Sequence, residues 1–177
     1  MNDVIKKNGV NFGIIIGIVS VLISTILYII NLELMFSIWV GIIMFLISLG
    51  IAIFSIVKSK KTLDGYITFK EAFTSYFITM ALSSIISTLF MFVLFNYVDP
   101  EAKVTLSEIA LKKSVEMMQS VGAKSEDIRS TVEQIKDVDN FSIASLAKSY
   151  IFGLIFYIII GLIVAAAIKK NKPEFEN

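Results

Sequence analysis

The stretch Phe12–Leu32, FGIIIGIVSVLISTILYIINL, decides the fold because none of its 21 residues carries a charge. A helix that crosses the roughly 30 Å hydrocarbon core of a bilayer needs about 20 predominantly apolar residues. Three more charge-free stretches of 24, 27 and 20 residues follow: Leu34–Val57, Ala72–Val98 and Ser149–Ile168. Buried helices of soluble proteins are not expected to contain runs of this length. The sequence therefore predicts an all-α integral membrane protein, built as a four-transmembrane-helix bundle.

The composition excludes several classes of function. The 177 residues are 56% hydrophobic and 18% charged, whereas soluble domains contain about 25% charged residues. The absence of Cys and His excludes disulfides, thiolate and imidazole metal sites, and catalysis that depends on either residue. The net charge of +1 gives no electrostatic support for nucleic-acid binding. The sequence also lacks the Walker A, G-x-G-x-x-G and G-x-S-x-G motifs. We therefore expect no catalytic residues, no cofactor, no metal site and no nucleic-acid partner.

Lysines beside the predicted spans indicate the orientation. If the N-terminus is cytoplasmic, the inner segments hold nine cations and five acidic residues, and the outer segments hold seven cations and ten acidic residues. The clusters KSKK at 58–61 and KKNK at 169–172 adjoin span ends, where the positive-inside bias operates. We therefore expect both termini to be cytoplasmic.

The chain is predicted to form a single membrane domain, residues 1–177, with one polar insert at 99–148. Thr105 and Glu108 form a capping-box pattern that predicts the start of a helix, and Gly122 is placed to end it. Ser125 is placed to cap a second helix. We therefore expect an extracytoplasmic helical hairpin between the third and fourth spans. About 40 residues are too few to bury a core of their own, so its apolar side must rest on the membrane surface, on the outer ends of the spans or on a partner.

Two shorter connections join the other spans. Only Asn31–Leu34 separates the first two spans, which predicts a tight antiparallel hairpin. In the inner connection, Asp64-Gly65 is a turn signal, and Thr68 with Glu71 forms a capping box at the start of the third helix. This capping role accounts for Glu71; a ligand or partner site built on Tyr66, Lys70 and Glu71 is the alternative.

Each span carries a stripe of small or hydroxyl residues, which allow helices to approach closely in a membrane. The stripes are Gly9, Gly13, Gly17, Ser20 and Ser24; Ser37, Gly41, Ser48, Ala52 and Ser55; Ala72, Ser75, Thr79, Ser83 and Ser87; and Ser149, Gly153, Tyr157, Gly161 and Ala165. Packing within one bundle and homodimerisation through the first span are the two interpretations, and the first is favoured because four helices need partners.

Three segments carry a resemblance to a known family. Gly65–Phe73 reads GYITFKEAF and leads into the third span, which ends in Phe95–Pro100, FNYVDP; the last span closes with Ala166–Lys170, AAIKK. With its acidic helical insert, this arrangement resembles the domain-of-unknown-function 4199 family of small bacterial four-span membrane proteins. The resemblance covers nearly the whole chain. It implies a protein of the bacterial cytoplasmic (inner) membrane with an uncharacterised role, and it supplies no catalytic or binding residues.

These features favour a non-enzymatic interaction, assembly or accessory component of the membrane, acting as a homo-oligomer or with a membrane-protein partner. The alternative is a small transporter or channel formed by oligomerisation. Its polar path would be lined by the hydroxyl face of the third span: Ser75, Thr79, Ser83, Ser84, Ser87 and Thr88. Against transport, no charged residue lies within a span, although such residues usually mark ion and proton pathways.

The expected orientation can be tested by cysteine labelling, because the chain contains no Cys of its own. A single cysteine in the 58–61 segment should be protected from a membrane-impermeant maleimide added to intact cells. A single cysteine in the 99–148 segment should react. Labelling of the 58–61 segment from outside would overturn the orientation.

Overall fold

The structure is a computed structural model that describes residues 2–136 and 138–173. Its helices are α1 (Asp3–Ile30), α2 (Ile38–Thr62), α3 (Phe69–Val93), α4 (Pro100–Ser120), α5 (Ser125–Ile135) and α6 (Ile143–Ile168). A 3-10 turn, η1 (Leu32–Phe36), precedes α2, and a π-helical turn, η2 (Leu94–Val98), extends α3.

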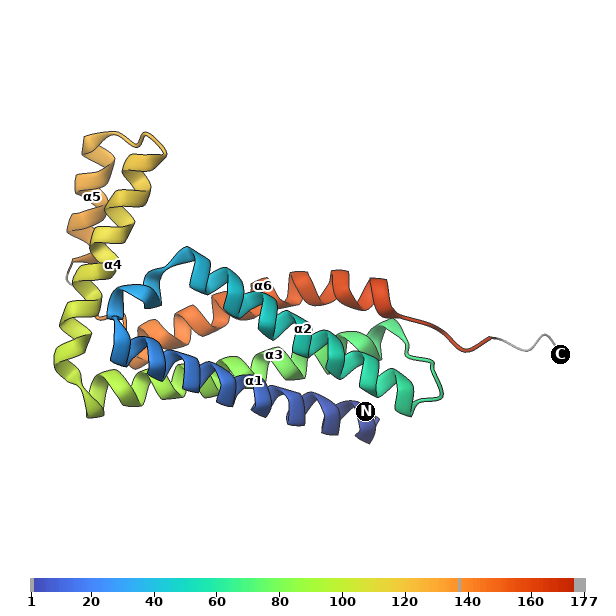
Figure 1. Ribbon diagram of the computed structural model, residues 1–177. Coiled ribbons are helices and arrows are strands. Elements are labelled where there is room, and N and C mark those ends of the chain that lie inside the picture. Colours follow the sequence, from blue (N-terminus) through green and yellow to red (C-terminus); the bar gives the residue numbers. More distant parts are fainter. Residues whose placement is uncertain (1, 137, 174–177) are drawn as a thin grey trace.

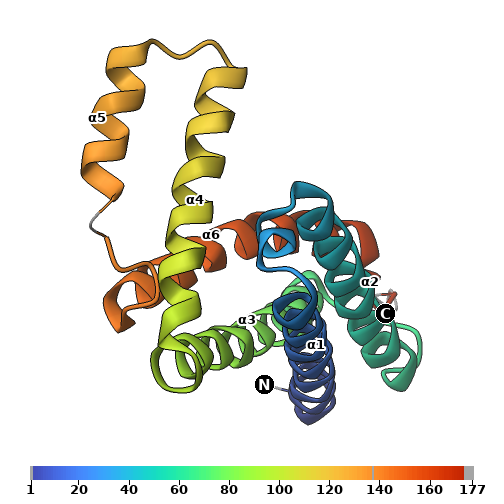
Figure 2. The same cartoon turned by 60° about the vertical axis from the view of Figure 1, so that its left-hand side comes forward.

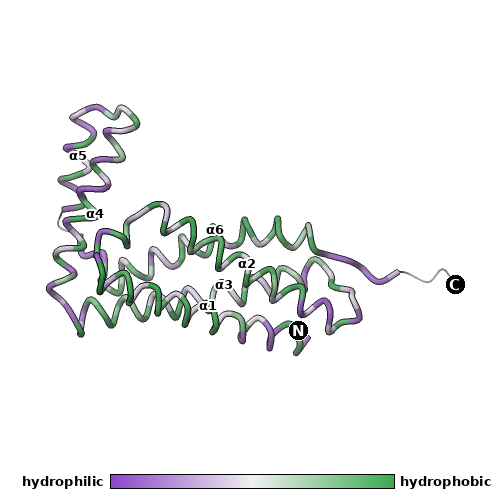
Figure 3. Tube along the Cα trace, in the orientation of Figure 1, coloured by the Kyte–Doolittle hydropathy of each residue, from purple (hydrophilic) through white to green (hydrophobic). Residues whose placement is uncertain are grey.

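The four long helices run side by side along one axis, while the α4–α5 hairpin stands crosswise at one end (Figure 1). The long helices α1, α2, α3 with η2, and α6 are each long and apolar enough to cross a membrane. They are predominantly hydrophobic along their length, whereas α4 and α5 carry many hydrophilic residues (Figure 3). The prediction of an all-helical protein with four membrane spans is confirmed, and the chain is a multi-pass membrane protein.

Helix α3 is the centre of the bundle, because it contacts α1, α2 and α6. Its closest neighbour is α1, which presents Gly9, Gly13 and Gly17 toward it. A Cβ atom added at Gly17 would lie 2.9 Å from the Cβ of Ile86, and one at Gly13 would lie 3.0 Å from the carbonyl oxygen of Thr79. The glycines of the first span therefore pack against α3 of the same chain, as the bundle interpretation predicts.

The half of the bundle that contains the α2–α3 connection is called the inner half. It contains the main apolar core. Tyr76 of α3 is completely buried, and its ring packs against Gly161 of α6, where an added Cβ would lie 2.7 Å from the ring. The other buried members of this core are Ile5, Ile16, Ala52, Ile56, Ile67, Ala72, Met80 and Ala165.

The long helices extend beyond the charge-free stretches. Helix α1 begins at Asp3 and includes Lys6 and Lys7, and α6 begins at Ile143 and includes Lys148. A lysine near the end of a span can keep its ammonium group at the membrane surface while its stem lies along apolar surface. A charge therefore limits the membrane-embedded part of a helix without ending the helix.

The connection between α1 and α2 is longer than predicted from Asn31–Leu34. The side chain of Asn31 accepts a hydrogen bond from the backbone N–H of Glu33 at 2.8 Å, which starts η1, and α2 begins only at Ile38. The predicted start of the second span at Leu34 is wrong for the helix, because hydropathy cannot distinguish an apolar 3-10 turn from an α-helix.

The inner connection agrees with the sequence. Asp64 and Gly65 both have positive φ, 56° and 84°, as a turn requires. The capping box is present, since Glu71 accepts from the N–H of Thr68 at 3.0 Å and the Thr68 hydroxyl accepts from the N–H of Glu71 at 3.3 Å. An isolated β-bridge between Ile67 and Lys170 joins this connection to the end of α6.

The insert forms the expected helical hairpin, but its helices start elsewhere. Helix α4 begins at Pro100 with Asp99 as its N-cap, so the predicted start at Thr105 is wrong. Asp99 accepts a hydrogen bond from the N–H of Ala102 at 3.0 Å, and proline is favoured at the first helical position. The N-cap of α5 is Lys124, so Ser125 is its first residue and not its cap.

The end of α4 is as predicted. Gly122 follows it with a φ of +75° and donates its N–H to the carbonyl of Gln119 at 3.0 Å. A left-handed glycine is a common helix terminator.

The root of the hairpin is fastened to the end of the bundle. Asp99 accepts a hydrogen bond from the hydroxyl of Tyr28 near the end of α1. The ring of Phe95 lies 4.6 Å from that of Phe141, centroid to centroid, and Leu106 of α4 is buried in the same cluster. The apolar side of the insert was expected to pack on the membrane surface, on the ends of the spans or on a partner. At the root of the hairpin, it packs on the ends of the spans.

The two hydrogen bonds to Asp99, first from Tyr28 and then from the Ala102 N–H, lower the pKa of its carboxyl below the ordinary value of 3.8. A carboxyl with a lower pKa in the folded protein stabilises the fold above its unfolded pKa, and this stabilisation is lost as the pH falls through the folded pKa.

We expect Asp99→Asn to lower the thermal unfolding midpoint in detergent at pH 7, and the difference from the wild type to shrink once the pH is lowered below the ordinary carboxyl pKa of 3.8. Glu108→Gln, on the exposed side of α4, is the control and should leave the midpoint nearly unchanged at both pH values. An Asp99→Asn effect that does not change with pH would contradict this assignment.

The glycine contact between α1 and α3 should be essential for stability. Gly17→Leu would overpack this contact and should lower the free energy of unfolding by about 1–3 kcal/mol. Gly50→Leu is the matched control, because an added Cβ at Gly50 meets nothing within 4 Å. Denaturant titration in mild detergent measures both variants, and equal loss of stability in the two would refute the packing role.

Candidate functional site

A layer of polar side chains lies in the inner half of the bundle between α1, α2 and α3. The side-chain amide of Asn8 donates to the Ser59 hydroxyl at 3.0 Å, and the Ser55 and Ser75 hydroxyls lie 3.1 Å apart. The Thr79 hydroxyl is 2.8 Å from the carbonyl of Ser75 and 3.2 Å from that of Gly9. The four hydroxyl residues are completely buried, so this layer is closed, with its polar groups paired to one another. Its hydrogen bonds have the packing role expected between membrane helices.

Beyond this layer, toward the hairpin end, the bundle contains a polar cavity of about 260 Å³. Its walls come from all four long helices, and most of its lining side chains carry a hydroxyl: Ser20, Ser48, Ser83, Ser84, Ser87, Thr88, Ser149, Tyr150 and Tyr157. Ile16, Met80 and Gly153 complete the lining. The predicted hydroxyl face of the third span thus points into the interior of a single chain.

Several of these hydroxyls lack a partner. Ser83, Ser84 and Ser87 donate to carbonyls of their own helix, whereas Thr88 and Tyr157 make no hydrogen bond within the described residues. The same is true of Ser20, Ser48 and Ser149. These hydroxyls are therefore free to form hydrogen bonds with water or with a polar ligand in the cavity.

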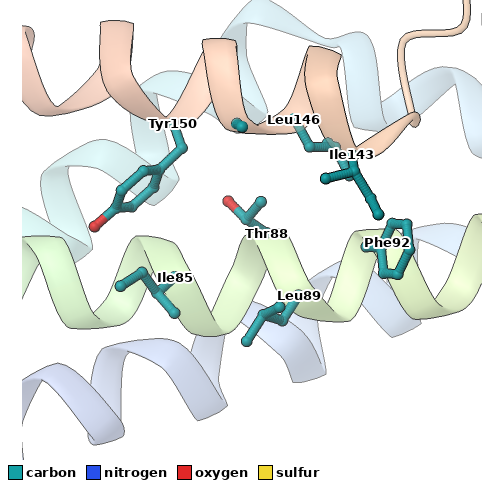
Figure 4. Close-up of a pocket in the computed structure, with 8 residues that line it drawn as sticks. Ile85, Thr88, Leu89, Phe92, Ile143, Leu146 and Tyr150 are labelled. Atoms are coloured by element: carbon teal, nitrogen blue, oxygen red, sulfur yellow. The ribbon is translucent and has the colours of Figure 1, made fainter.

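An apolar groove of about 330 Å³ adjoins the cavity between α3 and α6. Its lining is Ile85, Thr88, Leu89, Phe92, Ile143, Leu146, Ala147 and Tyr150 (Figure 4). Thr88 and Tyr150 border both spaces, and Figure 4 shows their side chains extending into the gap between the two helices. Leu89 and Ile143 are 57% and 70% exposed, so the groove is open to the surroundings of the bundle.

The alternative site in the inner connection is brought together only in part. Tyr66 and Glu71 line a pocket of about 380 Å³, together with Lys170 and Lys172 from beyond α6, but Lys70 does not. The ammonium of Lys170 lies 5.3 Å from the centre of the Tyr66 ring. Glu71 is engaged by Thr68 in the capping box, and the pocket is lined by side chains of both charges.

The hairpin has an apolar stripe that the rest of the chain buries only at its root. Ala102, Leu106 and Ala110 follow helical spacing along one face of α4; Lys113 interrupts this face, and Met117 and the C-cap residue Val121 continue it toward the tip. Leu106 is 1% exposed, whereas Met117 and Val121, near the tip, are 67% and 77% exposed. Figure 2 shows that the tip of the hairpin projects past the long helices.

Some charged residues of the hairpin form surface pairs. The Lys113 ammonium lies 2.9 Å from the Glu116 carboxylate, and the Arg129 guanidinium lies 3.1 Å from that of Glu133. Both pairs are exposed, where such contacts contribute little stability. Within residues 2–136 and 138–173, no group of three or more acidic side chains is arranged to hold a metal ion.

Comparison with known proteins places the chain in a family. Residues 11–170 match the family model described as "Protein of unknown function (DUF4199)". No curated protein and no solved structure matches the chain. The family match includes all of α2 to α6 and most of α1. The chain therefore belongs to the DUF4199 family of proteins of unknown function.

Proposed function

We propose that this chain is a non-enzymatic interaction or accessory component, which binds another membrane protein through the tip of the α4–α5 hairpin. The observation that carries this proposal is the apolar stripe of α4. Its root is buried on the bundle, and its continuation at Met117 and Val121 is exposed where the hairpin extends past the bundle. An exposed continuation of a buried face is typical of an interaction site.

The composition of the hairpin favours a protein partner over a lipid surface. Helices that lie on a membrane are rich in Lys and Arg on their polar side, whereas the 99–148 segment together with Glu33 holds ten acidic residues and seven cations. An anionic membrane surface would repel this segment. Methionine, by contrast, adapts to different apolar surfaces and is frequent at binding sites.

The proposal includes a location in the bacterial cytoplasmic membrane, with both termini in the cytoplasm and the hairpin outside. This location follows from the family resemblance and the lysine bias. The basic clusters at the end of α2 and after α6 lie at the same end of the bundle, opposite the hairpin (Figure 1). The chain would therefore bind its partner at the outer face of the cytoplasmic membrane.

The polar cavity favours a second candidate function, the transport of a small uncharged solute. Its hydroxyls face the interior of one chain, so a path would not require the oligomer that the sequence suggested. The closed layer at Ser55, Ser75 and Thr79 seals the inner half in this conformation. Transport would require this layer to open, and reconstituted vesicles without solute flux would count against it.

We expect a photocrosslinking amino acid at Met117 to crosslink to a distinct protein in native membranes. The same amino acid at Gln119, which is exposed on another face of α4, should not. The double substitution Met117→Glu and Val121→Glu should prevent co-purification of that protein, because it places charge in an apolar contact. Gln119→Glu is the matched control.

Three crosslinking results are distinguishable. A crosslink to a different membrane protein supports an accessory role, and a crosslink to a second copy supports the homo-oligomer. Crosslinks from Met117 to lipid alone would refute the proposed function.

A further inference from the structure

We propose that the groove between α3 and α6 and the adjoining polar cavity together bind an uncharged membrane amphiphile. Its hydrocarbon chain would occupy the groove, and its hydroxyl or carbonyl head would reach the hydroxyls of the cavity. This site is separate from the hairpin tip and independent of the interaction described above.

The groove has the properties of a hydrocarbon site. It lies within the outer half of α3 and the first turns of α6, and its lining is apolar except for Thr88 and Tyr150. Leu89, within the charge-free part of α3, leaves it open to the bilayer. A hydrocarbon chain can therefore enter from the side without crossing a polar barrier.

The cavity has the properties of a site for the head. Thr88, Ser149 and Tyr157 line this space, and their hydroxyls make no hydrogen bond within the described residues. Hydroxyls both donate and accept, so they suit either a hydroxyl or a carbonyl. Because Thr88 and Tyr150 border both spaces, one molecule can occupy the groove and the cavity together.

The lack of charged side chains in the lining of the groove and the cavity favours an uncharged ligand. None of the described residues that line either space is charged, and an unpaired charge at this depth in a bilayer is costly. A phospholipid head with its phosphate is therefore disfavoured, whereas a glycerol, alcohol or ketone head is suitable. The paired layer at Thr79 closes the cavity below in this conformation, so a bound ligand can be held there.

The test uses the full chain in phosphatidylcholine nanodiscs, with a monoacylglycerol that carries a photoactivatable diazirine in its acyl chain as the probe. We expect saturable labelling of peptides that contain residues 85–92 and 143–150. Unlabelled monoacylglycerol should compete, and phosphatidylglycerol, which adds a charged phosphate, should not.

Two variants separate the site from ordinary lipid contact. An added Cβ at Gly153 meets nothing within 4 Å, so Gly153→Leu fills the cavity without displacing the backbone, and it should lower saturable labelling about tenfold or more. Gly50→Leu, equally free of neighbours but outside the cavity, is the control and should not change labelling. Thr88→Val with Tyr157→Phe removes two hydroxyls at nearly constant shape and should lower labelling by about tenfold.

The competing results are clear. Labelling that does not saturate, that phosphatidylglycerol displaces equally, or that Gly153→Leu leaves unchanged would overturn the proposal. The last result would mean that the cavity holds only water. Matching unfolding midpoints for Gly153→Leu and the wild type show that lost labelling reflects a filled cavity and not a misfolded bundle.

Discussion

The close approach of α1 to α3 at Gly9, Gly13 and Gly17 is the constraint on which the rest of the bundle depends. With no Cβ in the way, Ile78, Leu82 and Ile86 of α3 pack directly on the backbone of α1. Lipid provides no hydrophobic force between helices, so such dispersion contacts and a few interhelical hydrogen bonds must hold the spans together. The same approach lets the Thr79 hydroxyl reach the carbonyl of Gly9. The close packing of α1 on α3 and the hydrogen bond between these helices therefore both follow from the same close approach.

The two halves of the bundle differ because α6 packs on α3 by two kinds of surface. At the inner end, Gly161 and Ala165 allow the aromatic ring of Tyr76 to fill the interface. Farther out, hydroxyl side chains and Gly153 face one another and leave the polar cavity, and the groove opens beside it. A bundle that is tight at one end and hollow at the other can hold a ligand in its membrane-embedded part.

The hairpin illustrates how one junction directs a whole element. Asp99 ends the π-helical turn, caps α4 and accepts the Tyr28 hydroxyl, and the Asn96 amide donates to the carbonyl of Phe141 at 2.9 Å. These bonds turn the chain crosswise to the spans and bury Leu106. They also direct the continuation of the same face, at Met117 and Val121, away from the bundle. The interaction surface we propose is thus set at its root, since Asp99 lies about five helical turns before Met117.

The sequence by itself determined the four spans, the capping box at Thr68 and Glu71, the turn at Gly65 and the end of α4 at Gly122, because each depends on local hydropathy or local hydrogen bonding. It misplaced the start of α4 at Thr105, since Asp99-Pro100 competes for the same role and only the burial of Ala102 and Leu106 decides between them. It identified the stripes of small and hydroxyl residues but not the helices that they contact, because an apolar span has no polar side to show which face is buried.

Only the tertiary structure decided that Gly17 packs on Ile86 and that the tip of the hairpin is left uncovered. It also decided that the hydroxyls of Ser75 and Thr79 are hydrogen-bonded while those of Thr88 and Tyr157 are not. Those outcomes depend on which helices meet, a property of long-range packing that composition and periodicity do not contain.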